Sequence, residues 1–174
     1  SYRQDTAIED RLAECELTTI LWLGHLANLH DRFGEAQCYF DEGLRLARAK
    51  KRRRVEVSFL LNLAGMVVHG LGDFVTAKKH YLLALKLATE IGFRWGEGSA
   101  LLELGDLLRL QGEYSTALEM FQRAWLIFEQ INHPLKAIYS RLMMGRLYAY
   151  LGDSERAGRV LAPLPEELND FAED

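Results

Sequence analysis

A repeat of about 40 residues constrains this chain more than any other feature of its sequence. A glycine recurs at positions 24, 65, 105 and 145, spaced by 41, 40 and 40 residues, and an alanine follows each glycine twelve residues later. The position sixteen residues after each glycine is large and apolar, and its occupants are Phe40, Tyr81, Phe121 and Leu161. Self-similarity at this period predicts a solenoid of stacked units, in which each unit buries its apolar face against its neighbours.

Each unit contains two segments with apolar residues at helical spacing, one before the glycine and one after it. The segments are separated by Gly72-Asp73, Gly112-Glu113 and Gly152-Asp153 in the last three units. Glycine accepts the left-handed conformation that ends a helix, and an acidic residue at the start of the next helix complements its dipole. All three prolines lie at or beyond position 134. We therefore predict an all-α chain with eight main helices between about residues 5 and 162.

The small residues of the repeat have a mechanical role. Side chains larger than alanine would force two crossing helices beyond the roughly 8 to 10 Å that separates packed helix axes. In the third unit, Gly105 and Ala117 are expected to let the two helices touch, and Phe121 is expected to fill the space beside them.

The four units resemble the tetratricopeptide repeat family, in its form of about 40 residues. The resemblance is carried by LWLG with EAQCYFDEGLRLA, NLAG with GDFVTAKKHYLLALKLA, LELG with GEYSTALEMFQRAWLIF, and LMMG with GDSERAGRVLAPL. It implies a right-handed superhelical solenoid of four helix-turn-helix repeats that forms a single domain over residues 1–174. The repeats are expected at about residues 12–52, 53–92, 93–132 and 133–164, followed by an acidic tail at 165–174.

Two units depart from the pattern. The first has Asp31-Arg32 where the others have glycine and an acid, so its turn is expected to be looser or displaced toward Gly34. The fourth carries Gly158, Pro163 and Pro165 in or after its second helix, which should shorten that helix and end the array.

The resemblance implies binding on the concave surface that the family's first helices line. The residues three before, one after and four after each repeat glycine should face inward, together with the position six before it. Four residues should border this stripe, namely Trp22, Glu103, Met143 and Tyr150. The predicted concave stripe comprises Leu21, Trp22, His25, Asn28, Phe59, Asn62, Met66, His69, Leu102, Asp106, Arg109, Tyr139, Leu142 and Arg146. Its mixture of aromatic, Met, amide and charged side chains suits a partner helix or an extended peptide, although a solvated face without a ligand has the same composition.

We therefore interpret the chain as a non-enzymatic protein-interaction scaffold or sensor module. The fragment FRWGEGSALLELGDLLRLQGEY is similar to repeat arrays of multidomain bacterial regulators, so a larger bacterial regulator is the expected context. The alternative is a small-ligand sensor that controls an attached effector. The histidines lack helical metal-site spacing, and no phosphate-binding loop or serine elbow occurs, so neither a metal nor a cofactor is predicted.

Charge is unevenly distributed along a chain of net charge −4. Seven basic residues and no acid lie between Leu44 and Arg54, whereas five acids and no base lie between Glu166 and Asp174. Cations at the end of a helix stabilise its dipole, and polyanion or nucleic-acid contact is the second alternative. The five consecutive basic residues at the end of this segment form the basic run, which comprises Lys50, Lys51, Arg52, Arg53 and Arg54. Because the net charge is negative, extended nucleic-acid binding is not expected. Weak, salt-sensitive association of the basic run with the acidic tail of another copy is expected.

The remaining composition predicts a cytoplasmic protein. Cys15 and Cys38 form neither a zinc spacing nor a disulfide framework, which fits a reducing compartment. The longest apolar run, around Phe59 to Val68, is interrupted by Asn62 and is too short to span a bilayer. The opening sequence SYRQDTAIED lacks the basic and apolar regions of a secretory signal.

Overall fold

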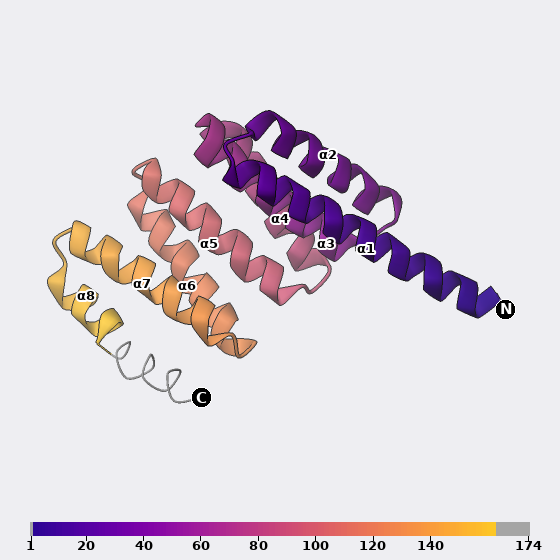
Figure 1. Ribbon diagram of the computed structural model, residues 1–174. Helices are drawn as coiled ribbons and strands as arrows, with labels where there is room; N and C mark the ends of the chain where they lie inside the picture. The colour runs from indigo at the N-terminus through magenta and orange to yellow at the C-terminus, as the bar shows by residue number, and fades with distance from the viewer. Residues whose placement is uncertain (1, 163–174) are drawn as a thin grey trace. The chain divides into compact units, whose positions relative to one another are not determined.

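The computed structural model describes residues 2–162, and for residues 2–7 and 10 it describes the backbone alone (Figure 1). The predicted acidic tail, with Pro163 and Pro165, lies outside the described residues. Within the described range every regular element is helical, which confirms the predicted all-α class and the helix-turn-helix units. The elements are α1 (Tyr2–Leu29), α2 (Phe33–Ala49), α3 (Arg53–Met66), η1 (Val67–Leu71), α4 (Phe74–Glu90), α5 (Arg94–Leu110), α6 (Tyr114–Gln130), α7 (Pro134–Tyr150) and α8 (Ser154–Leu161).

The chain divides into two compact units, Ser1–Gly96 and Glu97–Asp174, with the boundary inside α5. In the first unit α1 packs against α2, α2 against α3, and α3 against α4. In the second unit α6 packs against α7, and α7 against α8. Within each unit, these helices pack against the next one along the chain, as in a helical repeat.

Every turn between consecutive helices contains one residue in the left-handed conformation. Within the repeats the residue has φ 57° at Asp31 and 67°, 80° and 78° at Gly72, Gly112 and Gly152. Between the repeats, φ is 54° at Lys51, 65° at Gly92 and 52° at Asn132. In most turns, the residue after the left-handed one donates its N–H to the carbonyl of the residue five positions earlier. The Glu113 N–H, for example, donates to the Leu108 carbonyl at 2.9 Å, which satisfies a carbonyl at the helix end.

The first turn corrects the sequence-based expectation. It is not displaced toward Gly34, which lies inside α2. Asp31 occupies the same repeat position as Gly72 and adopts the left-handed conformation itself, and Arg32 donates to the Ala27 carbonyl at 2.9 Å. Aspartate tolerates this conformation better than most residues with a side chain.

Two of the three predicted acidic helix starts are side-chain caps. Asp73 accepts the Thr76 N–H at 3.0 Å, and Asp153 accepts the Arg156 N–H at 2.9 Å. Glu113 occupies the third position without a side-chain capping bond, because its longer side chain is a poorer N-cap.

The large residue sixteen positions later packs closely on three of the four repeat glycines, including Gly105 of the third unit, for which this was predicted. A Cβ on Gly24, Gly105 or Gly145 would overlap Phe40, Phe121 or Leu161, respectively. At Gly65 a Cβ would be 3.7 Å from the Tyr81 hydroxyl, which is an ordinary contact. Three of these large residues are among the largest fully buried side chains, which include Phe40, Phe59, Tyr81, Phe121 and Phe128.

The last described helix, α8, has 8 residues, compared with 17 in each of α2, α4 and α6. Of the residues expected to shorten it, Gly158 lies inside α8, and Pro163 and Pro165 lie outside the described residues.

The continuous helical stretch Arg53–Leu71, formed by α3 and η1, has 19 residues and a mean hydropathy of 1.2 over its most apolar window. By length and composition alone this helix, which is longer than the apolar run Phe59 to Val68 within it, could cross a membrane. Val57, Leu60 and Leu63 are buried, as expected of a core helix of a helical repeat, and such helices pass the same criterion.

Candidate functional site

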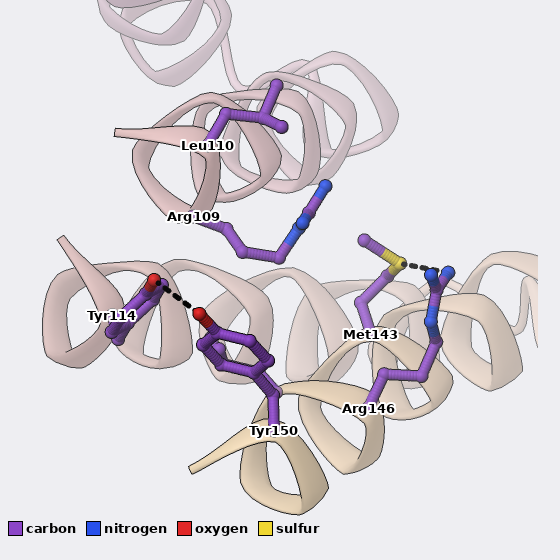
Figure 2. Close-up of a pocket in the computed structure, with 7 residues that line it drawn as sticks. Arg109, Leu110, Tyr114, Met143, Arg146 and Tyr150 are labelled. Carbon is purple, nitrogen blue, oxygen red and sulfur yellow. Dashed lines mark hydrogen bonds between the residues drawn. The ribbon is translucent and has the colours of Figure 1, made fainter. Parts of the chain in front are cut away.

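A pocket of about 360 Å³ lies in the second unit, where the ends of α5 and α7 meet the start of α6 (Figure 2). Its walls combine two guanidinium groups, two phenol rings and aliphatic or thioether side chains. The lining residues are Arg109, Leu110, Tyr114, Met143, Arg146, Leu147 and Tyr150.

Helical spacing explains how α7 supplies most of this lining. Met143, Leu147 and Tyr150 follow one another at intervals of four and three residues, so they lie on one face of the helix. Met143 and Leu147 are buried and form an apolar floor, whereas Tyr150 is exposed at the edge. Arg146 follows Met143 by three residues and extends to the same side.

The two arginines of the pocket differ in their partners. Arg109 Nε donates to Asp106 Oδ1 at 2.8 Å, and both side chains are about one-third exposed. Arg146 Nη1 approaches Met143 Sδ at 3.9 Å, and thioether sulfur is a weak acceptor. Among the side chains that the structure describes, which are those of residues 8, 9 and 11–162, no carboxylate forms an ion pair with Arg146. Arg146 therefore presents a cation to the pocket.

Two tyrosines close one end of the pocket. The Tyr114 hydroxyl donates to the Tyr150 hydroxyl at 3.3 Å, and the rings meet edge to face with centroids 5.4 Å apart. Donation to Tyr150 raises the pKa of Tyr114, because the hydrogen bond stabilises the protonated phenol.

The arrangement suits a carboxylate attached to an apolar group. A guanidinium binds a carboxylate through paired, charge-assisted hydrogen bonds. The Met143 and Leu147 side chains would contact the apolar group, and the phenol rings add surface with polar hydroxyl groups at the rim.

The structure brings together part of the predicted concave stripe. Arg109 and Arg146 line the same pocket, and Asp106 holds Arg109. Met143 and Tyr150, predicted to border the stripe, also line it. Leu110, Tyr114 and Leu147 were missed. One sequence signal could have found Leu110, which stands five residues after its repeat glycine, as Tyr150 does.

Three predicted stripe residues are core residues instead. Phe59, Met66 and Leu102 are only 0%, 1% and 2% exposed. The Phe59 ring lies against Gly43 of α2, where an added Cβ would overlap it. Because these side chains are almost fully buried and do not line the pocket, their assignment to the partner-binding surface was wrong.

The other predicted stripe residues keep some exposure. The Asn62 amide donates to the Ser58 carbonyl of its own helix at 2.8 Å, so it is half-buried and already bonded. The His25 ring meets Phe40 edge to face, and burial lowers the pKa of His25. Leu21 and Asn28 are half-buried, whereas Trp22, His69, Tyr139 and Leu142 are exposed.

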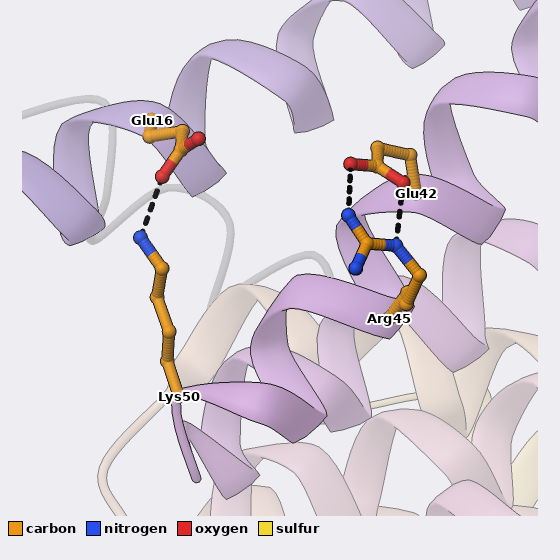
Figure 3. Close-up of polar contacts among 4 residues, drawn as sticks. All are labelled: Glu16, Glu42, Arg45 and Lys50. Carbon is orange, nitrogen blue, oxygen red and sulfur yellow. Dashed lines mark hydrogen bonds and ion pairs between the residues drawn. The ribbon is translucent and has the colours of Figure 1, made fainter.

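Two residues of the basic run, Lys50 and Arg53, form ion pairs within the first unit. Lys50 binds Glu16 at 2.6 Å, as Figure 3 shows beside the neighbouring Glu42–Arg45 pair, and Arg53 binds Glu90 at 2.8 Å. The Arg54 guanidinium lies 5.3 Å from the centroid of the Phe93 ring. Lys50, Arg53 and Arg54 therefore have partners within the first unit, without a polyanion.

A second pocket, of about 440 Å³, lies beside the basic run. It is lined by Glu14, Leu17, Lys51, Arg52, Arg53, Arg54, Val55 and Ile91. Glu14 and the paired Glu90 next to Ile91 reduce its positive charge, so it is a poorer anion site than the run alone predicts.

Among the described residues, no three His, Cys, Asp or Glu side chains gather closely enough to hold a metal ion. Cys15 and Cys38 are free thiols, and both are exposed.

The sequence profile of the tetratricopeptide repeat matches residues 56–130. That segment belongs to the tetratricopeptide repeat family. The match covers most of the second and third repeats and confirms the resemblance read from the sequence. No curated protein sequence matches the chain.

Solved structures share the tetratricopeptide-like fold over nearly the whole chain. Aspartyl phosphate phosphatase F from Bacillus subtilis is 14% identical, with 90% of this chain and 41% of that chain covered and a TM-score of 0.83. A Rap protein complexed with Competence and Sporulation Factor is 18% identical, with 91% and 45% covered and a TM-score of 0.80. A putative kinesin light chain from Podosopora anserina, with nearly identical TPR-like repeats, is 14% identical, with 86% and 73% covered and a TM-score of 0.71.

At these identities the likeness concerns the fold alone. The chain spans 41% to 66% of the length of four of the solved structures that it resembles. Tetratricopeptide-like repeats are generally non-enzymatic interaction scaffolds.

Proposed function

We propose that this chain is a non-enzymatic protein-interaction module whose second unit holds a partner segment by a carboxylate. The carrying observation is the pocket in which Arg146 presents a guanidinium beside Arg109, above the apolar floor of Met143 and Leu147. The preferred partner segment is an acidic residue next to an apolar one, in an extended or helical peptide.

Two further observations support this proposal. The tetratricopeptide repeat match and the fold support a role as an interaction scaffold. One similar structure is a Rap protein complexed with Competence and Sporulation Factor, so a related fold accommodates a bound factor. A cytoplasmic bacterial regulator is the setting that we propose for the module.

The test uses a display library of short peptides selected against the intact chain. We expect the recovered peptides to share Asp or Glu beside Leu, Met or an aromatic residue. Replacing the acidic residue by its amide should weaken binding about tenfold or more, because a hydrogen bond to a charged group contributes about 1.5–3 kcal/mol.

A matched pair of variants locates the site. Arg146→Ala should lower the affinity of the selected peptides about as much as the amide substitution does. Arg123→Ala is the control, because Arg123 is an exposed arginine of α6 that does not line the pocket. Equal affinity of both variants for an acidic peptide would place the binding elsewhere and reject this site.

A small carboxylate ligand is the second candidate, and the pocket volume favours it. About 360 Å³ falls within the usual range of about 300–1,000 Å³ for small-molecule sites. Selection that yields no Arg146-dependent peptide, together with Arg146-dependent binding of a free aromatic or aliphatic carboxylic acid, would favour a sensor over a scaffold.

Polyanion binding through the basic run and head-to-tail association with the acidic tail are weaker proposals. Lys50 and Arg53 already bind Glu16 and Glu90, and the tail lies outside the described residues. A strong, salt-sensitive retention on heparin that is lost in Lys51→Gln would revive the polyanion proposal.

A further inference from the structure

Helix α1 exposes an apolar stripe along its length. The stripe positions alternate by four and three residues, which is the heptad spacing of a coiled-coil seam. They are Ile8, Leu12, Cys15, Thr19, Trp22, Leu26 and Leu29, and all seven are exposed. Thr19 donates its hydroxyl to the Cys15 carbonyl at 2.8 Å, so its polar atom is satisfied within the helix.

The opposite face of α1 is already buried. Ala13, Leu17, Gly24 and Ala27 lie on that side and pack in the first unit, where α1 contacts α2. At 100° per residue the two sets lie nearly half a turn of the helix apart. A helix placed on the exposed stripe would therefore meet α1 without displacing α2.

Comparison among repeats identifies the stripe as a seat for a helix. Leu26 is 49% exposed, whereas Val67 and Leu147 at the same repeat position are 4% and 2% exposed. In those repeats a second helix precedes the first helix and packs against it, as α2 does with α3 and α6 with α7. Trp22 shows the same contrast with Leu63 and Met143, which are buried.

The length of the seam indicates which helix it fits. From Ile8 to Leu29 the stripe covers 22 residues, about 33 Å at 1.5 Å per residue. The second helices α2, α4 and α6 have 17 residues each, whereas α1 has 28. Figure 1 shows the N-terminal part of α1 extending past its neighbours in the first unit. A second α1 matches the seam along its whole length.

We propose that α1 pairs with α1 of a second copy of this chain, as a parallel two-stranded coiled coil. Leu12, Thr19 and Leu26 then occupy the a positions of the heptad, and Ile8, Cys15, Trp22 and Leu29 occupy the d positions. Such a contact is symmetric and closed, so it gives dimers and not filaments.

Charge complementarity favours the parallel, in-register arrangement. Arg11 precedes an a position and Glu16 follows a d position, which are the g and e positions of the heptad. In a parallel dimer, residue g of one helix faces residue e of the next heptad on the other helix. Arg11 of each copy therefore meets Glu16 of the other, on the carboxylate that Lys50 already contacts from within its own chain.

Sedimentation equilibrium of the full chain tests the pairing. We expect a reversible dimer whose dissociation constant changes little with salt, because the seam is apolar. Leu12→Glu should weaken it about tenfold or more by burying a charge. Leu135→Glu is the matched control, since Leu135 of α7 is 61% exposed and Leu12 is 63% exposed. A monomer in the wild type, or equal dissociation constants for the two variants, would overturn the proposal.

Thiol oxidation tests the direction and register. Parallel pairing places the two Cys15 thiols in one d layer, so a mild oxidant should link Cys38→Ala chains into a covalent dimer. Cys15→Ala chains, which keep the exposed Cys38 of α2, should stay unlinked under the same oxidant. If Leu12→Glu disrupts the dimer but oxidation does not link the two Cys15 thiols, parallel in-register pairing of α1 with α1 is rejected. A different helix would then occupy the exposed stripe of α1.

Discussion

The Phe121 ring lies directly over Gly105, where an added Cβ would be 2.7 Å from Cε1 of the ring. This contact joins α5 to α6 within one repeat. Tyr81 and Gly65 occupy the same two repeat positions, yet a Cβ on Gly65 would be 3.7 Å from the Tyr81 hydroxyl. The same substitution should therefore have opposite effects at the two glycines.

Gly105→Ala should lower the free energy of unfolding by about 1–3 kcal/mol, because the buried Phe121 ring must shift to admit the methyl group. Gly65→Ala should raise it by up to about 1 kcal/mol, since alanine is the better helix former and meets no obstacle. Urea unfolding of both variants measures the difference. Equal effects of the two substitutions would contradict the close crossing at Gly105.

Lys51 is held in the left-handed conformation, with φ 54°, at the turn between the first and second repeats. Lys51→Gly should stabilise the chain by about 1 kcal/mol, because glycine adopts this conformation without steric cost. Gly92 occupies the equivalent turn of the next repeat, and Gly92→Lys should destabilise by a similar amount. Lys51→Ala controls for the lysine side chain and should give no gain, as shown by its urea midpoint.

The repeat period and the turn chemistry allowed most of the fold to be predicted. Glycine and a large apolar residue at fixed spacing are local signals, because the two residues contact each other within one helix pair. The left-handed turn at Asp31 was missed, because aspartate lacks the sequence signature of glycine while the surrounding repeat still imposes the same backbone.

Which side chains are buried on the first helix of each repeat was harder to predict, because their burial depends on the helix that precedes it in the chain. Phe59 and Thr18 occupy the same repeat position, yet Phe59 is buried against α2 and Thr18 is exposed. The candidate pocket has a similar origin. Tyr114 and Tyr150 meet across 36 residues of sequence, and no local pattern links them.

Asp73 should make stability depend on acidic pH. Hydrogen bonds from the Thr76 side chain and from the Thr76 N–H lower the pKa of Asp73 below its ordinary value. A lowered pKa in the folded state means that the stabilisation is present above about pH 3.9, the unfolded value, and disappears as pH falls through the folded pKa.

Asp73→Asn separates charge from capping, since asparagine caps helices about as well as aspartate. At neutral pH the variant should be nearly as stable as the wild type, and its stability should fall less between neutral and strongly acidic pH. Asp73→Ala should be less stable throughout that range. Parallel pH profiles for wild type and Asp73→Asn would show that the carboxylate is not held by Thr76.

The hydroxyl pair at the pocket rim gives a spectroscopic prediction. Because Tyr114 donates to Tyr150, the pKa of Tyr114 is raised, and its protonated form is favoured until pH rises past the ordinary value of about 10. Tyr150→Phe removes the acceptor and should bring the pKa of Tyr114 down, as measured by NMR titration of the labelled ring. Tyr148→Phe is the control, because Tyr148 packs under Arg156 on α8 and not against Tyr114. If Tyr150→Phe left the titration of Tyr114 unchanged, the two rings would not meet in solution, and the rim of the pocket would have to be open instead of closed.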